Sequence, residues 1–157
     1  MKRSFSWLIP AALLFTFSTL TPSGGNAQTK YKVVEVKHLT TADDVSAPAE
    51  YLNVSYDSLR EELAKVGIFG TVVGDGGTIS DADAADAVVL ECKVIKLHNN
   101  SLEGGHVQIG VTLLSRGSRK PIRQFTTQEM ATNGGSWGHK AKVTAHYLAE
   151  EIKRNLK

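Results

Sequence analysis

The residues best placed for chemistry lie near the end of the chain, in the loop GGSWG. Gly134, Ser136 and Gly138 satisfy the G-x-S-x-G pattern of a nucleophile elbow, in which a sharp turn between a strand and a helix exposes a serine hydroxyl. A hydrolase of that type also needs an acid and a histidine carried by later strands, whereas we expect only one helix after Ser136. We therefore predict that Ser136 caps this helix, and that the chain has no catalytic residues and is not an enzyme.

The same loop is the candidate binding site. The first backbone N–H groups of a helix are free and the helix dipole is positive there, so the loop could hold an anion or a small molecule. Any helix start offers this, and helix capping explains the glycines more simply. We keep ligand binding as the alternative. The residues of this candidate ligand loop are Gly134, Gly135, Ser136, Trp137 and Gly138.

The histidines do not form a metal-binding pattern. His139 and His146 share a predicted helix but lie seven residues, or roughly 10.5 Å, apart along its axis. Zinc ligands on one helix are normally four residues apart. His98 and His106 flank the segment HNNSLEGG and could approach each other across a hairpin, with Glu103 in the loop. We interpret them as solvated hairpin residues and predict neither a metal nor a cofactor.

Four aspartates in the segment DGGTISDADAAD suggest a calcium site. The segment does not meet the EF-hand pattern, which alternates Asp or Asn ligands, then has glycine and a bidentate glutamate. We interpret the aspartates as residues that cap a short helical turn, from Ser80 to Ala85, and keep a loop soluble. The four are Asp75, Asp81, Asp83 and Asp86.

The stretch DAADAVVLECKVIKL, residues 83–97, is the strand around which we expect the sheet to be built. Side chains alternate across a strand, so one row should face the core and the other should be half solvated. Cys92 lies in the inward row and is interpreted as structural, because a catalytic thiol requires exposure and a neighbouring cation. The inward row is Val88, Leu90, Cys92 and Val94, and the outer row is Val89, Glu91, Lys93, Ile95 and Leu97.

Two stretches carry apolar residues at the period of an α-helix. The first lies between Ala49 and Val66, and Gly67 follows as a left-handed cap. The second runs from Trp137 to Leu156. The stripe residues are Leu52, Tyr56, Leu59, Leu63 and Val66 in the first helix, and Trp137, Ala141, Ala145, Leu148, Ile152 and Leu156 in the second.

The remaining strands complete an α+β fold. We predict strands over Lys30–Leu39 and Ile68–Val73, parallel to each other through a crossover helix. A polar linker, residues 40–48, leads into that helix. Strands at His106–Leu114 and Ile122–Thr132 follow the central strand as a three-stranded antiparallel meander. We therefore expect a two-layer sandwich, β-α-β then meander then C-terminal helix, with both helices on one face of the sheet.

The first residues indicate export. Lys2 and Arg3 precede the apolar run WLIPAALLFTFSTL, which is too short to span a bilayer, and small residues stand at Gly25 and Ala27. We predict a signal peptide over residues 1–27, cut after Ala27, and a single domain over residues 28–157. The chain has 18 basic and 16 acidic residues, and loss of the two leader cations leaves it formally neutral. This balance argues against a nucleic-acid binder.

The order of these segments resembles a known family. Ala85 and Asp86 lead into AVVLECKVIKL, and the hairpin VQIGVTLL, the GGSWG loop and a helix with Ala145 and Leu148 follow. This pattern is similar to the small bacterial exported proteins and lipoproteins grouped as domain of unknown function 4410. The resemblance implies an envelope location and a compact α+β domain, and it brings no catalytic residues. Unlike the lipoprotein members, this chain has no cysteine at the cleavage site.

We expect a non-enzymatic periplasmic or secreted domain. Its partner should be another envelope protein, bound through the open sheet face or a sheet edge, with no stable membrane insertion after cleavage. The alternative is a small-molecule or ion-binding module that uses the candidate ligand loop, and a hydrolase comes third. The sequence leaves the oligomeric state open.

Overall fold

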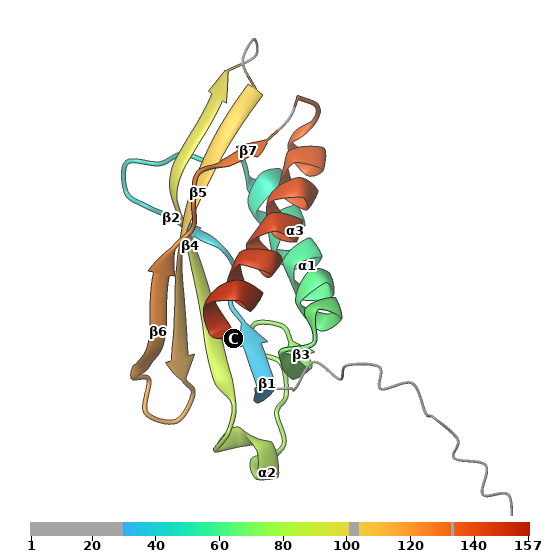
Figure 1. Ribbon diagram of the computed structural model, residues 1–157, viewed down its shortest axis with the longest axis vertical. Helices are drawn as coiled ribbons and strands as arrows, with labels where there is room; N and C mark the ends of the chain where they lie inside the picture. Colours follow the sequence, from blue (N-terminus) through green and yellow to red (C-terminus); the bar gives the residue numbers. More distant parts are fainter. Residues whose placement is uncertain (1–29, 101–103, 133) are drawn as a thin grey trace, which may run out of the picture.

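The computed structural model describes residues 30–100, 104–132 and 134–157 of the chain (Figure 1). The predicted signal peptide, residues 1–27, lies outside these ranges, and so does Glu103. The bounds of the elements are β1 Tyr31–Val36, β2 Thr40–Thr41, α1 Ala49–Val66, β3 Phe69–Val73, α2 Asp81–Ala84, β4 Val88–Asn100, β5 Gly104–Ser115, β6 Pro121–Thr126, β7 Met130–Thr132 and α3 Trp137–Leu156.

The strands form one mixed sheet in the order β3-β1-β4-β5-β6, with β2 beside β4 and β7 beside β5. β1 runs parallel to both β3 and β4. β4, β5 and β6 are successively antiparallel. The α+β class, the parallel pairing of β1 with β3 and the central place of β4 were all predicted and are confirmed.

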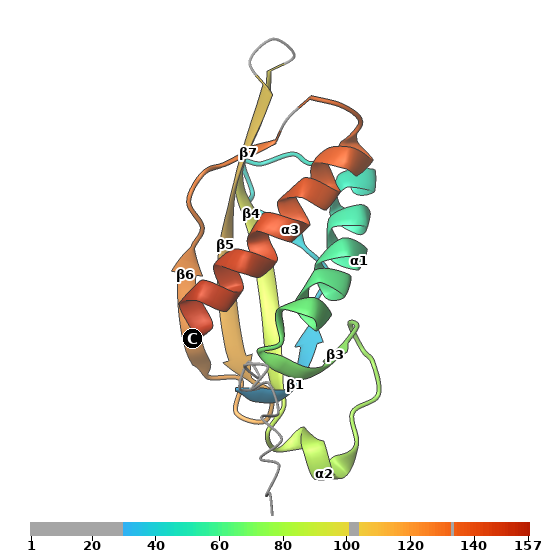
Figure 2. The ribbon, with the colours of Figure 1, turned by 45° about the vertical axis from the view of Figure 1, so that its right-hand side comes forward.

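Helices α1 and α3 lie side by side across one face of the sheet (Figure 1, Figure 2). Their apolar stripes and the inward side chains of the strands form a single core. Gly67 ends α1 with a φ of 75°, the left-handed conformation predicted for it. Tyr51, which lies just before the predicted stripe, is also fully buried, and its hydroxyl donates to Thr144 of α3 at 3.0 Å. Among the described helices, none is both long and apolar enough to cross a bilayer.

The inward row of β4 faces the core as predicted, but one residue of the outer row changes sides. The pairing of β4 with β5 shifts register between Val94 and Lys96. An extra residue at such a bulge reverses the alternation that follows it. Leu97 is therefore paired with Val107 and packs against the core. Its predicted place in the half-solvated row is wrong.

The hairpin between β4 and β5 is longer than the sequence predicts. The sequence predicts a loop over residues 98–105, but the pairing of β4 with β5 continues as far as Asn100 and Gly104. The base of the extension has a further strand on one side, because β7 pairs with β5 from Gly105 to Val107, whereas β2 pairs with β4 before the extension begins. β2 itself falls in the segment 40–48, which was predicted as a linker. Pairing of β4 with β5, and of β7 with the base of the hairpin, keeps a polar, glycine-rich sequence extended.

The single strand predicted over Ile122–Thr132 is interrupted, and the two parts, β6 and β7, both pair with β5. Thr127 lies at the break. Its N–H donates to the carbonyl of Ile109 at 2.9 Å, and its hydroxyl accepts from the N–H of Ile109 at 3.0 Å. The carbonyl of Thr127 accepts instead from the side chain of Gln108. The hydroxyl therefore replaces a backbone acceptor and lets the edge strand bend.

The face of the sheet away from α1 and α3 is only partly open. Because β3 and β4 flank β1 in parallel, the segment that joins them has to cross β1. The N–H of Gly76 in this segment donates to the Glu35 carboxylate at 3.2 Å. Three side chains of β1 and β4 point away from the helices and are nevertheless buried: Val33, Glu35 and Val89.

Candidate functional site

The candidate ligand loop forms the start of α3. Ser136 is the N-cap residue, and its hydroxyl accepts a hydrogen bond from the N–H of His139 at 3.3 Å. Gly135 has a φ of 122°, which glycine adopts at little cost. The predicted capping role of Ser136 is confirmed. Binding of an ion or small molecule by this loop stays a prediction.

Trp137 of the same loop packs inward. Its ring lies edge-on to the ring of Tyr51, with the centroids 5.8 Å apart, and the Lys140 ammonium lies 5.1 Å from its centroid. Lys140 also donates to the Asn99 side-chain oxygen at 2.5 Å. These contacts fix the start of α3 against α1 and the end of β4.

The histidine pair of the hairpin does come together. His98 and His106 are direct partners in the pairing of β4 with β5, which confirms their predicted approach. Glu129 lies nearby, and a hydrogen bond from Lys96 holds its pKa below the ordinary value, with smaller contributions from the two histidines. In the part of the chain that the structure describes, no group of three or more His, Cys, Asp or Glu side chains is placed to hold a metal.

Other residues considered as ligands are engaged in separate polar contacts. His146 reaches across to α1, and two of the four aspartates pair with lysines of the β1 region. Their positions therefore serve local contacts rather than one shared site. The pairs are His146–Glu62 at 3.0 Å, Asp75–Lys37 at 2.7 Å and Asp83–Lys32 at 2.5 Å.

Cys92 lies in the core between the sheet and the helices, as predicted. Burial in apolar surroundings raises the pKa of its thiol to about 12. The thiolate is the reactive form of cysteine, and at neutral pH this side chain is a thiol. Its role is therefore packing.

Glu35 is the polar residue that sequence reasoning missed. Its carboxylate is only 5% exposed and accepts hydrogen bonds from Lys37 at 2.7 Å, from the Gly76 N–H and from Arg116 at 3.3 Å. Burial by itself would raise the pKa of Glu35, but these bonds together outweigh burial and hold the pKa below its ordinary value. The sequence shows only a glutamate among valines. Lys37 is a local partner, but the other two contacts come from Gly76 and Arg116, which are 41 and 81 positions away.

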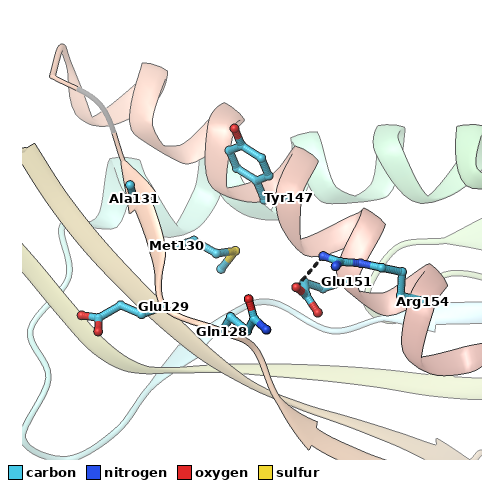
Figure 3. A pocket seen from close by; sticks show the side chains of 7 residues that line it. All are labelled: Gln128, Glu129, Met130, Ala131, Tyr147, Glu151 and Arg154. Carbon is cyan, nitrogen blue, oxygen red and sulfur yellow. Dashed lines mark hydrogen bonds and ion pairs between the residues drawn. The ribbon is translucent and has the colours of Figure 1, made fainter.

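A surface groove of about 320 Å³ lies between β7 and α3 (Figure 3). One wall comes from β7 and the segment that leads into it, and the other from α3. Arg154 and Glu151 form an ion pair at 2.5 Å on the helix side, and the Tyr147 side chain is 51% exposed. The lining residues are Gln128, Glu129, Met130, Ala131, Tyr147, Glu151 and Arg154.

The groove offers recognition chemistry. β7 is paired with β5, no other described strand pairs with it, and Met130 and Ala131 of β7 line the groove. In the groove lie the Met130 thioether, an aromatic ring and a guanidinium group (Figure 3). An open strand edge with apolar and charged side chains next to it is suited to an extended peptide segment. None of these residues was singled out from the sequence, because the groove forms only when β7 is placed beside α3.

No protein-family model matches this chain, and no curated protein matches it. Solved structures do share its fold. A Xanthomonas campestris protein of the domain of unknown function 330 family is 12% identical, with a TM-score of 0.55 over 85% of this chain and 90% of the other. A PelC dodecamer from Paraburkholderia phytofirmans is 13% identical, with a TM-score of 0.52 over 77% of this chain and 86% of the other.

A third structure, of a putative neuraminyllactose-binding hemagglutinin homolog from Helicobacter pylori, is 12% identical, with a TM-score of 0.50 over 87% of this chain and 89% of the other. At these identities the likeness establishes the fold alone. All three are bacterial proteins, and one belongs to a family of unknown function. Membership of the domain of unknown function 4410 stays a prediction.

Proposed function

We propose that this chain is an exported, non-enzymatic domain of the bacterial envelope that binds another envelope protein. The observation that carries the proposal is the groove between β7 and α3, where an open strand edge lies beside exposed side chains of a helix. The predicted signal peptide and the family resemblance support the location. The partner inserts an extended segment along β7.

The chemistry of the groove defines the segment that fits it. An added strand takes its affinity from main-chain hydrogen bonds and its specificity from alternate side chains. The half-exposed Tyr147 ring supplies the accessible apolar surface, and Met130, which is 8% exposed, lines the same groove. The Arg154 side chain is 65% exposed although it pairs with Glu151, so it can also receive a carboxylate. The partner segment therefore carries an apolar residue close to an acidic residue.

The states of the nucleophiles support a non-enzymatic role. The Ser136 hydroxyl is used in capping α3, and the Cys92 thiol is buried with a pKa raised to about 12. A nucleophile needs an adjacent base and access to substrate. Among the described residues, the groove lining contains neither serine, cysteine nor histidine.

Site-specific photo-crosslinking in cells tests the proposal. A photoreactive amino acid in place of Tyr147 should capture one envelope protein, and Arg154→Glu should reduce that capture because the acidic contact becomes repulsive. Replacement of Lys142, an exposed residue of α3 outside the groove, is the matched control. Capture of the same proteins from both positions, or no capture from Tyr147, would contradict the proposal.

A further inference from the structure

The two long edges of the sheet carry opposite charge. β3 and β6 lie at the two ends of the strand order, on opposite sides of the molecule (Figure 1). Beside β3 is a groove of about 430 Å³ lined by Asp57, Arg60, Glu61, Ala64 and Val72. The β6 edge carries Lys120 and Arg123. In the described part of the chain, Asp57, Glu61, Lys120 and Arg123 form no ion pair with one another or with other residues.

The charged side chains also lie on matching faces. Val72 pairs with the core residue Val34, so it points to the helix side of β3, where Asp57 and Glu61 rim the groove. Arg123 pairs with the core residue Leu113 and points to the helix side of β6. Two copies joined as one continuous sheet would keep their helices on the same side. Arg123 of one copy would then meet the acidic rim of the next.

Strand direction favours the same arrangement. β3, β1 and β4 run parallel, and β6 is related to β4 through the antiparallel β5, so β6 and β3 point the same way. A head-to-tail contact of β6 with β3 is therefore a parallel strand pair. A symmetric pair formed by two β6 edges would instead bring Lys120 and Arg123 of one copy close to the same residues of the other copy. A symmetric pair formed by two β3 edges would bring two acidic groove rims together. Like charges facing each other disfavour both symmetric pairs.

The two edges also have apolar contact surface. Ile122 of β6 is 47% exposed, and Val72 of β3 is only partly buried. Arg60, the cation in the β3 groove, lies over the Tyr56 ring with its guanidinium carbon 5.4 Å from the ring centroid. Its Nε is buried without a hydrogen-bond partner. Arg60 is thus turned into the protein, and the exposed rim of the groove is acidic.

We propose that this chain assembles head to tail with copies of itself, the basic β6 edge of one copy pairing with the acidic groove between α1 and β3 of the next. Such a contact uses two different surfaces of each copy, so repeated contacts produce a ring or an open filament. The β7–α3 groove is a separate surface. This inference therefore does not depend on the proposed partner.

Charge reversal with complementation tests the assembly. Light scattering and sedimentation at low salt should show particles larger than a monomer, shrinking as salt rises because exposed ion pairs are screened. Arg123→Glu and Glu61→Arg should each weaken association by roughly ten-fold or more. An equimolar mixture of the two variants should assemble again, because each reversed edge then finds a reversed groove and each unchanged edge an unchanged groove.

The control variant is Lys142→Glu, which makes an equal change of charge on an exposed position of α3 away from both edges. It should assemble like the wild type, and thermal unfolding should show that all three variants are folded. A wild-type chain that is monomeric at millimolar concentration and low salt would overturn the proposal. So would assembly that survives both reversals, or two variants that stay monomeric when mixed.

Discussion

At the scale of single residues, Thr127 shows how a side chain maintains an edge strand across a bend. Its hydroxyl accepts the N–H of Ile109 at 3.0 Å where a regular ladder would offer a carbonyl. Both groups are buried, and a buried N–H without a partner is costly. The segment TTQEM therefore needs a hydroxyl at this position, for a reason that a strand pattern cannot reveal.

Thr127→Val should lower the free energy of unfolding by about 1–3 kcal/mol, because it keeps the shape and leaves the Ile109 N–H unpaired. Thr127→Ser keeps the acceptor and loses one buried methyl group, which costs about 1 kcal/mol. Denaturant unfolding and hydrogen exchange of the Ile109 amide measure both effects. A Thr127→Val variant as stable as the wild type would show that the hydroxyl contributes nothing.

Glu35 makes stability depend on pH. Its pKa is held below the ordinary 4.5, so its contribution is complete above that value and is lost as the pH falls through the lower folded-state pKa. Glu35→Gln should cost about 1–3 kcal/mol at neutral pH, because two cationic side chains lose a charged acceptor. The difference from the wild type should shrink below about pH 4.5, as measured by denaturant unfolding across pH.

Glu91→Gln is the matched control for this prediction. Glu91 pairs with Arg119 at 2.9 Å, but both side chains are about half exposed. Exposed pairs contribute roughly 0–1 kcal/mol. A loss in Glu91→Gln as large as that in Glu35→Gln would mean that burial of the Glu35 carboxylate does not matter.

At the scale of elements, the start of α3 shows that Gly135 and Gly138 of the GGSWG loop serve different purposes. Gly135 has a φ of 122°, whereas Gly138 lies within the helix, and a Cβ there would be 3.1 Å from the Glu50 carboxylate. Glu50 is an exposed side chain that can move away. The conformational requirement of the loop therefore falls on Gly135, a variable position of the G-x-S-x-G pattern, whereas Gly138, a glycine of the pattern, is a tolerant position.

Gly138→Ala should raise the free energy of unfolding by about 0.5–1 kcal/mol, because alanine favours the helix and the Glu50 side chain can yield. Gly135→Ala should lower it by about 1–3 kcal/mol, because alanine is strained at that φ. Thermal and denaturant unfolding of the two variants check the opposite signs. Destabilisation by both changes would mean that the loop requires glycine at 138 for another reason.

The elements themselves were predictable to different degrees. α1 and α3 follow from stripes of five and six apolar residues spaced at the period of a helix. Such a stripe predicts which face of the helix is buried without knowledge of the surface that covers it. The hairpin extension and the split of β6 from β7 were not predictable. Pairing with β7 and the hydrogen bond of the Thr127 hydroxyl decide them, and these are contacts between segments distant in sequence.

At the scale of the whole molecule, Cys92 reports on unfolding of the entire domain. It lies on the central strand beneath both helices, and the chain has one cysteine. Maleimide labelling of the native protein at neutral pH should be slower by orders of magnitude than that of the denatured chain, and should follow the fraction unfolded as denaturant rises. Rapid labelling without denaturant would show that the sheet and helices separate locally.

The sequence by itself determined the α+β class, the two amphipathic helices, the central strand with its inward row, and Ser136 as a cap. Each of these depends on periodicity or on neighbours within a few positions, which a sequence displays directly. The tertiary structure alone decided the burial of Glu35, the return of Leu97 to the core, the groove beside β7 and the opposite charges of the two sheet edges. These features arise where segments far apart in the chain meet, and residue spacing does not encode that geometry.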